Sequence, residues 1–92
     1  MPSENLNEKI LKIKDNDEEI NLLLEKYKPF IAACTGEVSG KFVKYGEDDE
    51  LSVAMMAFVE AIKVYDGKKG NFLPFSSQVI KRRIIDYYRK EK

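Results

Sequence analysis

Ninety-two residues are enough for one small domain, and the absence of histidine removes both the commonest general base and the commonest metal ligand. The formal net charge of zero hides an uneven distribution: residues 1–65 carry 8 lysines and 13 acidic residues (−5), whereas residues 66–92 carry 8 cationic and 3 acidic residues (+5). Because Cys34 is the only cysteine and no apolar run is long enough for a signal sequence or a membrane span, we expect a cytoplasmic protein without membrane insertion.

Apolar residues at helical spacing predict a short helix over 4–14 and a longer helix that follows it. The polar run 15–17 ends the first helix and offers an N-cap for the second. Pro29 is expected to kink or divide the second helix, because proline lacks an N–H and clashes with the preceding turn. Helix then resumes as far as Phe42 and includes Gly36 and Gly40, one turn apart, which either admit a close neighbouring helix or weaken this one.

A turn at 44–46 is expected to precede the most regular helix of the chain, from Asp48 to Tyr65, with Asp48 or Asp49 as its N-cap. One stripe of this helix has close to ideal helical spacing and is expected in the core. It consists of Leu51, Ala54, Met55, Phe58, Ile62 and Tyr65.

Turn-forming residues at 66–71 separate that helix from a last one, which is expected to run from near Pro74 to Lys90. Its candidates for packing are Phe75, Val79, Ile80, Ile84, Tyr87 and Tyr88. No alternating pattern of the kind that strands show stands out anywhere. We therefore predict an all-α fold, a compact bundle of four to five helices.

The helix from Asp48 to Tyr65 also carries apolar residues outside its core stripe. They are Val53, Met56 and Val59, beside Ser52 and Glu60. Either the helix is buried on two sides, or this second strip binds a partner. Likewise, the acidic residues 47–50 either stabilise the helix N-terminus through its dipole or contact a basic partner.

The last third of the chain combines cations with aromatic side chains, which is typical of proteins that bind single-stranded or melted nucleic acid. Lys68, Lys69 and Asn71 either grip a phosphate or a single base, or belong to a solvated turn. Phe72 and Phe75 either anchor the start of the last helix in the core or stack on bases.

Three consecutive cations in the last helix cannot share one face, since successive residues are about 100° apart. We expect Lys81 and Arg82 to straddle one face, and Arg83 to point elsewhere, towards Asp86 or Tyr87 across one turn. No serine, threonine or cysteine has a patterned base nearby, and no phosphate-binding loop occurs. We therefore expect neither an enzyme nor a cofactor or metal.

Three segments, taken in order, resemble region 2 of bacterial sigma factors, the subunits that give RNA polymerase its promoter specificity. They are KYKPFIAACTGEV (26–38), DELSVAMMAFVEAIKVYD (49–66) and GKKGNFLPFSSQVIKRRIIDYYRKEK (67–92). The second matches the family pattern at Asp49, Phe58, Ala61, Tyr65 and Asp66, and the third at Gly70, Phe72, Phe75, Ile80, Ile84, Ile85, Asp86 and Arg89. The SVAMMAF centre and the IKRRIIDY ending are most similar to the sigma-I subgroup.

The resemblance implies a short helix and linker over 1–16 and a sigma region 2-like domain over 17–92, in which 48–66 binds the polymerase core and 67–92 binds the −10 promoter element. The implied contacts to the clamp coiled coil of the largest polymerase subunit, or to an anti-sigma factor, are Asp49, Ser52, Val53, Met56 and Val59. The implied contacts to the non-template −10 strand are Lys68, Lys69, Asn71, Phe72, Phe75, Gln78, Lys81, Arg82, Arg83 and Arg89.

Two departures from primary sigma factors qualify these roles. The 52–55 segment replaces a polar run, which implies a more apolar or a weaker contact with the core. Gln78 and Val79 replace the tryptophan pair of the melting wedge, so strand opening would depend on base capture. Sigma-I members are typically held by a membrane-anchored anti-sigma factor, whose cytosolic domain is an implied partner. No helix-turn-helix domain for the −35 element follows Lys92, so we expect this chain alone to bind DNA only weakly.

Two other classes of function compete with this interpretation. An adaptor would use the second apolar strip to bind another protein and would never touch DNA. A helix-turn-helix domain for double-stranded DNA is disfavoured, because no tight turn precedes the basic helix and the 66–72 loop is long for that motif.

Overall fold

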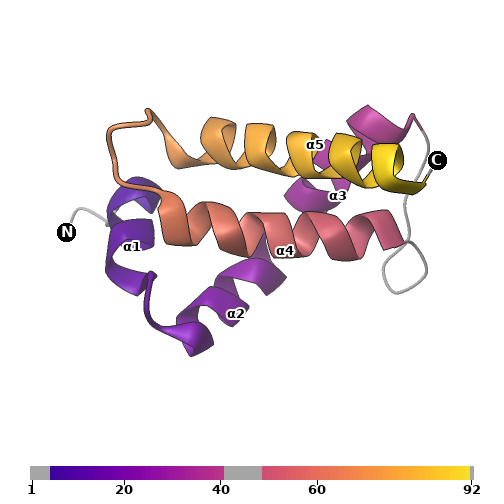
Figure 1. Ribbon diagram of the computed structural model, residues 1–92. Helices are drawn as coiled ribbons and strands as arrows, with labels where there is room; N and C mark the ends of the chain where they lie inside the picture. The colour runs from indigo at the N-terminus through magenta and orange to yellow at the C-terminus, as the bar shows by residue number, and fades with distance from the viewer. Residues whose placement is uncertain (1–4, 41–48, 92) are drawn as a thin grey trace.

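The computed structural model describes residues 5–40 and 49–91, and within these ranges the chain forms helices and no strands (Figure 1). The helices are α1 (Leu6–Ile13), α2 (Asp17–Lys26), α3 (Lys28–Ser39), α4 (Asp49–Val64) and α5 (Phe72–Glu91). The predicted all-α bundle is thus confirmed. The predicted turn at 44–46, the residues Phe42, Glu47, Asp48 and Lys92, and any N-cap at Asp48 lie outside the described residues.

Asparagine side chains cap the N-termini of the first two helices. The Asn5 side-chain oxygen accepts a hydrogen bond from the Glu8 N–H at 2.9 Å, and that of Asn16 accepts one from the Glu19 N–H at 3.1 Å. Each bond satisfies an N–H that has no partner within its own helix. The cap predicted within 15–17 is therefore Asn16.

The break between α2 and α3 lies at Tyr27, whose φ of −101° and ψ of 13° depart from helical values. Pro29 is the second residue of α3, where a missing N–H costs nothing, so proline divides the helix rather than kinking it. At the other end, Gly40 adopts a left-handed φ of 71° and donates to the Gly36 carbonyl at 2.8 Å. The helix therefore stops at Ser39, short of the expected Phe42, and Gly40 is its cap rather than an interior residue.

Helices α4 and α5 run antiparallel side by side, with α3 packed behind both of them (Figure 1). Helix α2 packs against α4, and α1 lies at the end of the hairpin where α4 connects to α5. The connection occupies 65–71, so the two helices that carry the candidate binding faces are held in a single hairpin.

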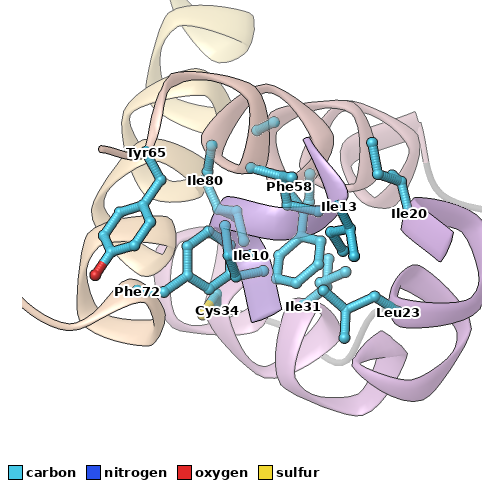
Figure 2. Packing of buried hydrophobic residues seen from close by; sticks show 14 of the residues in the cluster. Ile10, Ile13, Ile20, Leu23, Ile31, Cys34, Phe58, Tyr65, Phe72 and Ile80 are labelled. Carbon is cyan, nitrogen blue, oxygen red and sulfur yellow. The ribbon is translucent and has the colours of Figure 1, made fainter. Parts of the chain in front are cut away.

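The core is built around the ring of Phe58, which is fully buried (Figure 2). Its ring centroid lies 6.0 Å from that of Tyr27, 6.5 Å from that of Phe30 and 5.5 Å from that of Phe72. Of the predicted stripe on α4, Met55 is half-buried and the other members are buried. Ala57 and Ala61, which the prediction left out, are buried as well. Their small side chains let a neighbouring helix approach closely.

Helix α5 begins at Phe72, two residues before the predicted start at Pro74. The Phe75 N–H donates to the Asn71 carbonyl at 3.3 Å, which makes the turn before Pro74 helical. Proline at the third position is compatible with this start, because the first N–H groups of a helix have no partner within it.

Candidate partner-binding and nucleic-acid interfaces

The outer face of α4 gathers the five residues predicted to bind a protein. At about 100° per residue they fall within an arc of roughly 120°. They are Asp49, Ser52, Val53, Met56 and Val59. Asp49, Ser52 and Met56 are exposed, and Met56 has 74% of its surface open to solvent. The two valines are half-buried and pack against the core. The fold therefore covers the margins of the second strip and leaves its centre open.

The apolar part of this face extends one turn further than the sequence indicated. Val64 is 50% exposed and stands four residues after Glu60, on the side of α4 that borders α5. The sequence prediction assigns Val64 to neither stripe of this helix. Its position relative to Val53 and Glu60 at helical spacing is the signal that could have found it.

The outer face of α5 carries exposed polar and cationic side chains spaced by three or four residues. It consists of Gln78, Arg82, Ile85 and Arg89, with Lys81 half-buried at its edge. The prediction included all of these except Ile85, which is 41% exposed among the cations. An apolar side chain within a basic face offers contact to a base or a sugar, while the cations offer contact to phosphates.

Two cations of α5 are already engaged by carboxylates of other helices. The Lys81 ammonium lies 2.7 Å from a Glu37 oxygen on α3, and this hydrogen bond raises the pKa of Lys81. The Arg83 guanidinium makes two hydrogen bonds to Glu60 on α4, one of 2.7 Å from Nε, and they raise the pKa of Arg83.

The structure corrects the expected partner of Arg83. The expectation was a contact across one turn of α5, to Asp86 or Tyr87. Its carboxylate partner is instead Glu60 of the neighbouring helix, and the Asp86 charge contributes only a smaller part of the raised Arg83 pKa. Arg83 thus faces α4, whereas Arg82 stays on the outer face.

The connection between α4 and α5 is held by internal hydrogen bonds. The Tyr65 hydroxyl donates to the Gly70 carbonyl at 2.5 Å. An Asp66 carboxylate oxygen accepts from the Lys68 N–H at 2.9 Å, and this bond is the main reason that the pKa of Asp66 is lowered from its ordinary value. Gly67 and Gly70 have φ of 81° and 83°, which only glycine adopts without strain. The loop therefore presents its cations from a defined backbone.

Within this loop, Lys68, Lys69 and Asn71 are all exposed. The Lys69 ammonium lies 6.0 Å from the centroid of the Phe75 ring, at the outer limit of a cation–π contact. The Asn71 side-chain oxygen accepts from the Asn7 amide of α1 at 3.0 Å. The three loop residues predicted to bind nucleic acid thus share one exposed end of the hairpin.

The two phenylalanines at the start of α5 have different surroundings. Phe72 has no exposed surface, and its ring packs edge-on against Phe58 at 5.5 Å and Tyr65 at 5.4 Å. Its expected contact with DNA is therefore corrected: Phe72 is a core residue whose ring no base can reach. Phe75 is half-buried and borders a surface hollow between α4 and α5. The other residues lining the hollow are Glu60, Val64, Gln78, Val79, Arg82 and Arg83.

Cys34 is buried with its sulfur 3.5 Å from the Ser77 hydroxyl. Across residues 5–40 and 49–91, no three metal-binding side chains come together. None of the helices described has the length and apolar composition needed to cross a membrane.

Comparison with known proteins gives a consistent result. Residues 23–92 match the family described as Sigma-70 region 2. The chain is 66% identical over 92 residues to RNA polymerase sigma factor SigI7 of Acetivibrio thermocellus, covering 100% of this chain and 39% of that protein. It is 47% identical over 85 residues to SigI8 of the same species, covering 90% and 34%. It is also 44% identical over 79 residues to SigI of Bacillus subtilis, covering 85% and 31%. The chain thus spans well under half the length of these relatives.

Proposed function

Because the chain belongs to the sigma-70 region 2 family, we propose that it is the part of an RNA polymerase sigma factor that binds the polymerase core through α4 and the −10 promoter element through the 66–71 loop and α5. The observation that carries this proposal is the pair of chemically different outer faces on one hairpin. The α4 face is apolar with an acidic end, whereas the α5 face is basic. Such a domain makes two separate contacts and needs no chemistry of its own.

The contact with the core is assigned to the open part of the α4 face, around Asp49, Ser52 and Met56, with Val53 and Val59 at its margins. An exposed methionine fills irregular gaps at an interface because its side chain is flexible and polarisable. The clamp coiled coil of the largest polymerase subunit is the proposed partner. The cytosolic domain of an anti-sigma factor would inhibit by covering the same face.

The DNA contact is assigned to Lys68, Lys69, Asn71 and the outer face of α5. Cations at the loop and at Arg82 and Arg89 would neutralise phosphates of the non-template strand. Lys81 joins them, because its pair with Glu37 is partly exposed, and exposed pairs are weak enough for a phosphate to displace the carboxylate.

The hollow beside Phe75 is the proposed site for an unstacked base. Phe75 and Val64 offer apolar surface, and Gln78 and Arg82 offer hydrogen-bond donors at its rim. This arrangement suits base capture, which is the mode of strand opening expected when no tryptophan wedge is present. Arg83 is assigned a supporting role, since it is held by Glu60 at the wall of the hollow.

The test is binding of this chain to a purified clamp coiled-coil fragment, measured by calorimetry. Met56→Asp places a charge at the centre of the proposed interface and should abolish saturable binding. Leu22→Asp is the matched control, because Leu22 is an apolar side chain of α2 with 64% exposure. Loss of binding in Met56→Asp alone supports the proposal.

Absence of binding by the folded wild-type chain would contradict the assignment to the core, and equal losses in the two variants would contradict the assigned surface. An adaptor function predicts a different pattern. In that case, Lys81→Ala combined with Arg82→Ala would leave the activity of the intact factor unchanged.

A further inference from the structure

Helix α1 lies outside the part of the chain that matches the family, which begins at residue 23, yet it is placed beside the 65–71 connection (Figure 1). Asn7 of α1 and the adjoining Lys14 contact the two ends of that connection. It is anchored by Ile10 and Ile13, which are buried in the core together with Phe58 and Phe72 (Figure 2). Its position is therefore fixed by the same packing that holds α4 and α5.

The first contact is at the end of α4. The Lys14 ammonium donates a hydrogen bond to the Tyr65 carbonyl, and the Tyr65 N–H still donates to the Ala61 carbonyl as in the helix. Carbonyls at a helix C-terminus lack partners within the helix and carry partial negative charge, so a lysine is a favourable partner. Lys14 thereby fixes the point at which the chain leaves α4.

The second contact is at the beginning of α5. The Asn7 side-chain oxygen accepts from the Phe72 N–H at 2.8 Å, and its amide donates to the Asn71 side-chain oxygen at 3.0 Å. Phe72 is the first residue of α5, where an N–H has no partner within the helix. A residue 65 positions away in the sequence therefore supplies the cap and orients the neighbouring Asn71.

A third contact lies between the other two. The Leu11 side chain passes over Gly67, since a Cβ at that glycine would stand 3.5 Å from Leu11 Cδ1. The internal hydrogen bonds of the loop, from the Tyr65 hydroxyl and to the Asp66 carboxylate, shape its curve. The contacts with α1 tie that curve to the rest of the bundle.

We propose that α1 is a brace for the DNA-binding loop, and that Asn7 and Lys14 are positioning residues for promoter binding. Asn7 sets where α5 begins, and with it the positions of Asn71 and Phe75, which both belong to the proposed DNA-binding surface. The consequence for DNA rests on the proposed function, whereas the consequence for the loop itself does not.

The experiment compares Asn7→Ala with Asn16→Ala. Both remove an asparagine oxygen that caps a helix, but Asn16 caps α2 and is not among the residues that contact the loop. Each variant of the chain is assembled with polymerase core, and binding of a random-sequence pool of single-stranded oligonucleotides about 12 nucleotides long is measured by anisotropy. Hydrogen exchange of the 66–73 amides is measured in parallel on the chain alone.

Asn7→Ala should weaken DNA binding about 5-fold, the value expected for one lost cap, and should speed exchange of the 66–73 amides by a similar factor. Binding to the core should not change. Asn16→Ala should leave both DNA binding and loop exchange at wild-type values. Asn7→Asp, which keeps the oxygen acceptor, should restore protection of the Phe72 amide.

Equal DNA affinity and equal loop exchange in Asn7→Ala and Asn16→Ala would overturn the inference while leaving the proposed function in place. If the wild-type assembly bound no oligonucleotide, the proposed function would fail instead. The exchange measurement would then still decide whether α1 braces the loop.

Discussion

Phe72 offers the sharpest test of the structure, because the same residue is a base-stacking candidate by sequence and a core residue by burial. Its ring is fully enclosed and contacts the rings of Phe58 and Tyr65. Replacing a buried phenylalanine by alanine removes about 3–5 kcal/mol of stability. A domain of this length has roughly 5–14 kcal/mol in total, so Phe72→Ala should lose a substantial part of its stability.

The measurement is urea denaturation followed by far-UV circular dichroism. With a slope of about 2 kcal/mol per M, the loss corresponds to a fall of about 1.5–2.5 M in the midpoint. Phe72→Leu keeps most of the buried volume and should cost about 1 kcal/mol. Where Phe72→Leu is folded, its affinity for single-stranded DNA should match that of the wild type.

Phe75→Ala is the matched comparison, since Phe75 is half-buried beside the surface hollow. Phe75→Ala should lower the stability less than Phe72→Ala does. It should weaken DNA binding more than Phe72→Leu does. The core assignment would be refuted by a Phe72→Ala midpoint within about 0.5 M of the wild type together with lost DNA binding.

Three further predictions concern the loop and the basic helix. Arg82→Ala should reduce the slope of log binding constant against log salt concentration for single-stranded DNA by about 0.7. Arg83→Ala should reduce this slope by less, because Arg83 is paired with Glu60. Equal reductions would contradict the assignment of Arg82 to the outer face and of Arg83 to the contact with α4. Tyr65→Phe removes the hydrogen bond to the loop and should lower stability by about 1 kcal/mol, or Tm by about 4–8 °C. Tyr27→Phe should leave the stability unchanged. Equal decreases of Tm in the two variants, measured by calorimetry, would argue against the hydrogen bond from the Tyr65 hydroxyl. The Asp66 pKa lies below its ordinary value of 3.8, so its contribution to stability is complete above pH 3.8 and is lost as the pH falls through the lower folded value. An NMR titration that placed this pKa at or above 3.8 would show that the hydrogen bond from the Lys68 N–H is not formed.

Local signals in the sequence were sufficient for most of the helices. The cap within 15–17 and the division at Pro29 follow from chemistry within one or two turns, and so does the apolar stripe of α4. These features depend on residues close together in the chain, which periodicity and capping rules describe well. The same is true of the five residues on the outer face of α4, whose common direction follows from helical geometry.

Three of the errors arise from partners that are distant in sequence. The start of α5 was placed too late because its cap, Asn7, is 65 residues away. Arg83 was given a partner on its own helix, whereas Glu60 comes from α4. Phe72 was placed among DNA contacts because its burial depends on how α4 and α5 pack. Residue spacing along one helix carries no information about any of these three contacts.

The aromatic rings of the core also bear on how such a domain diverges. An unbroken series of ring contacts leads from Phe30 through Phe58, Phe72 and Tyr65 to Phe75, with centroid separations between 5.4 and 6.5 Å. A substitution at any inner ring would have to be compensated by its neighbours, which constrains these positions over evolutionary time. The exposed side chains of α5 take no part in the series, so this packing does not constrain them. We therefore expect related domains to retain this common set of rings while the outer face of α5 differs among them.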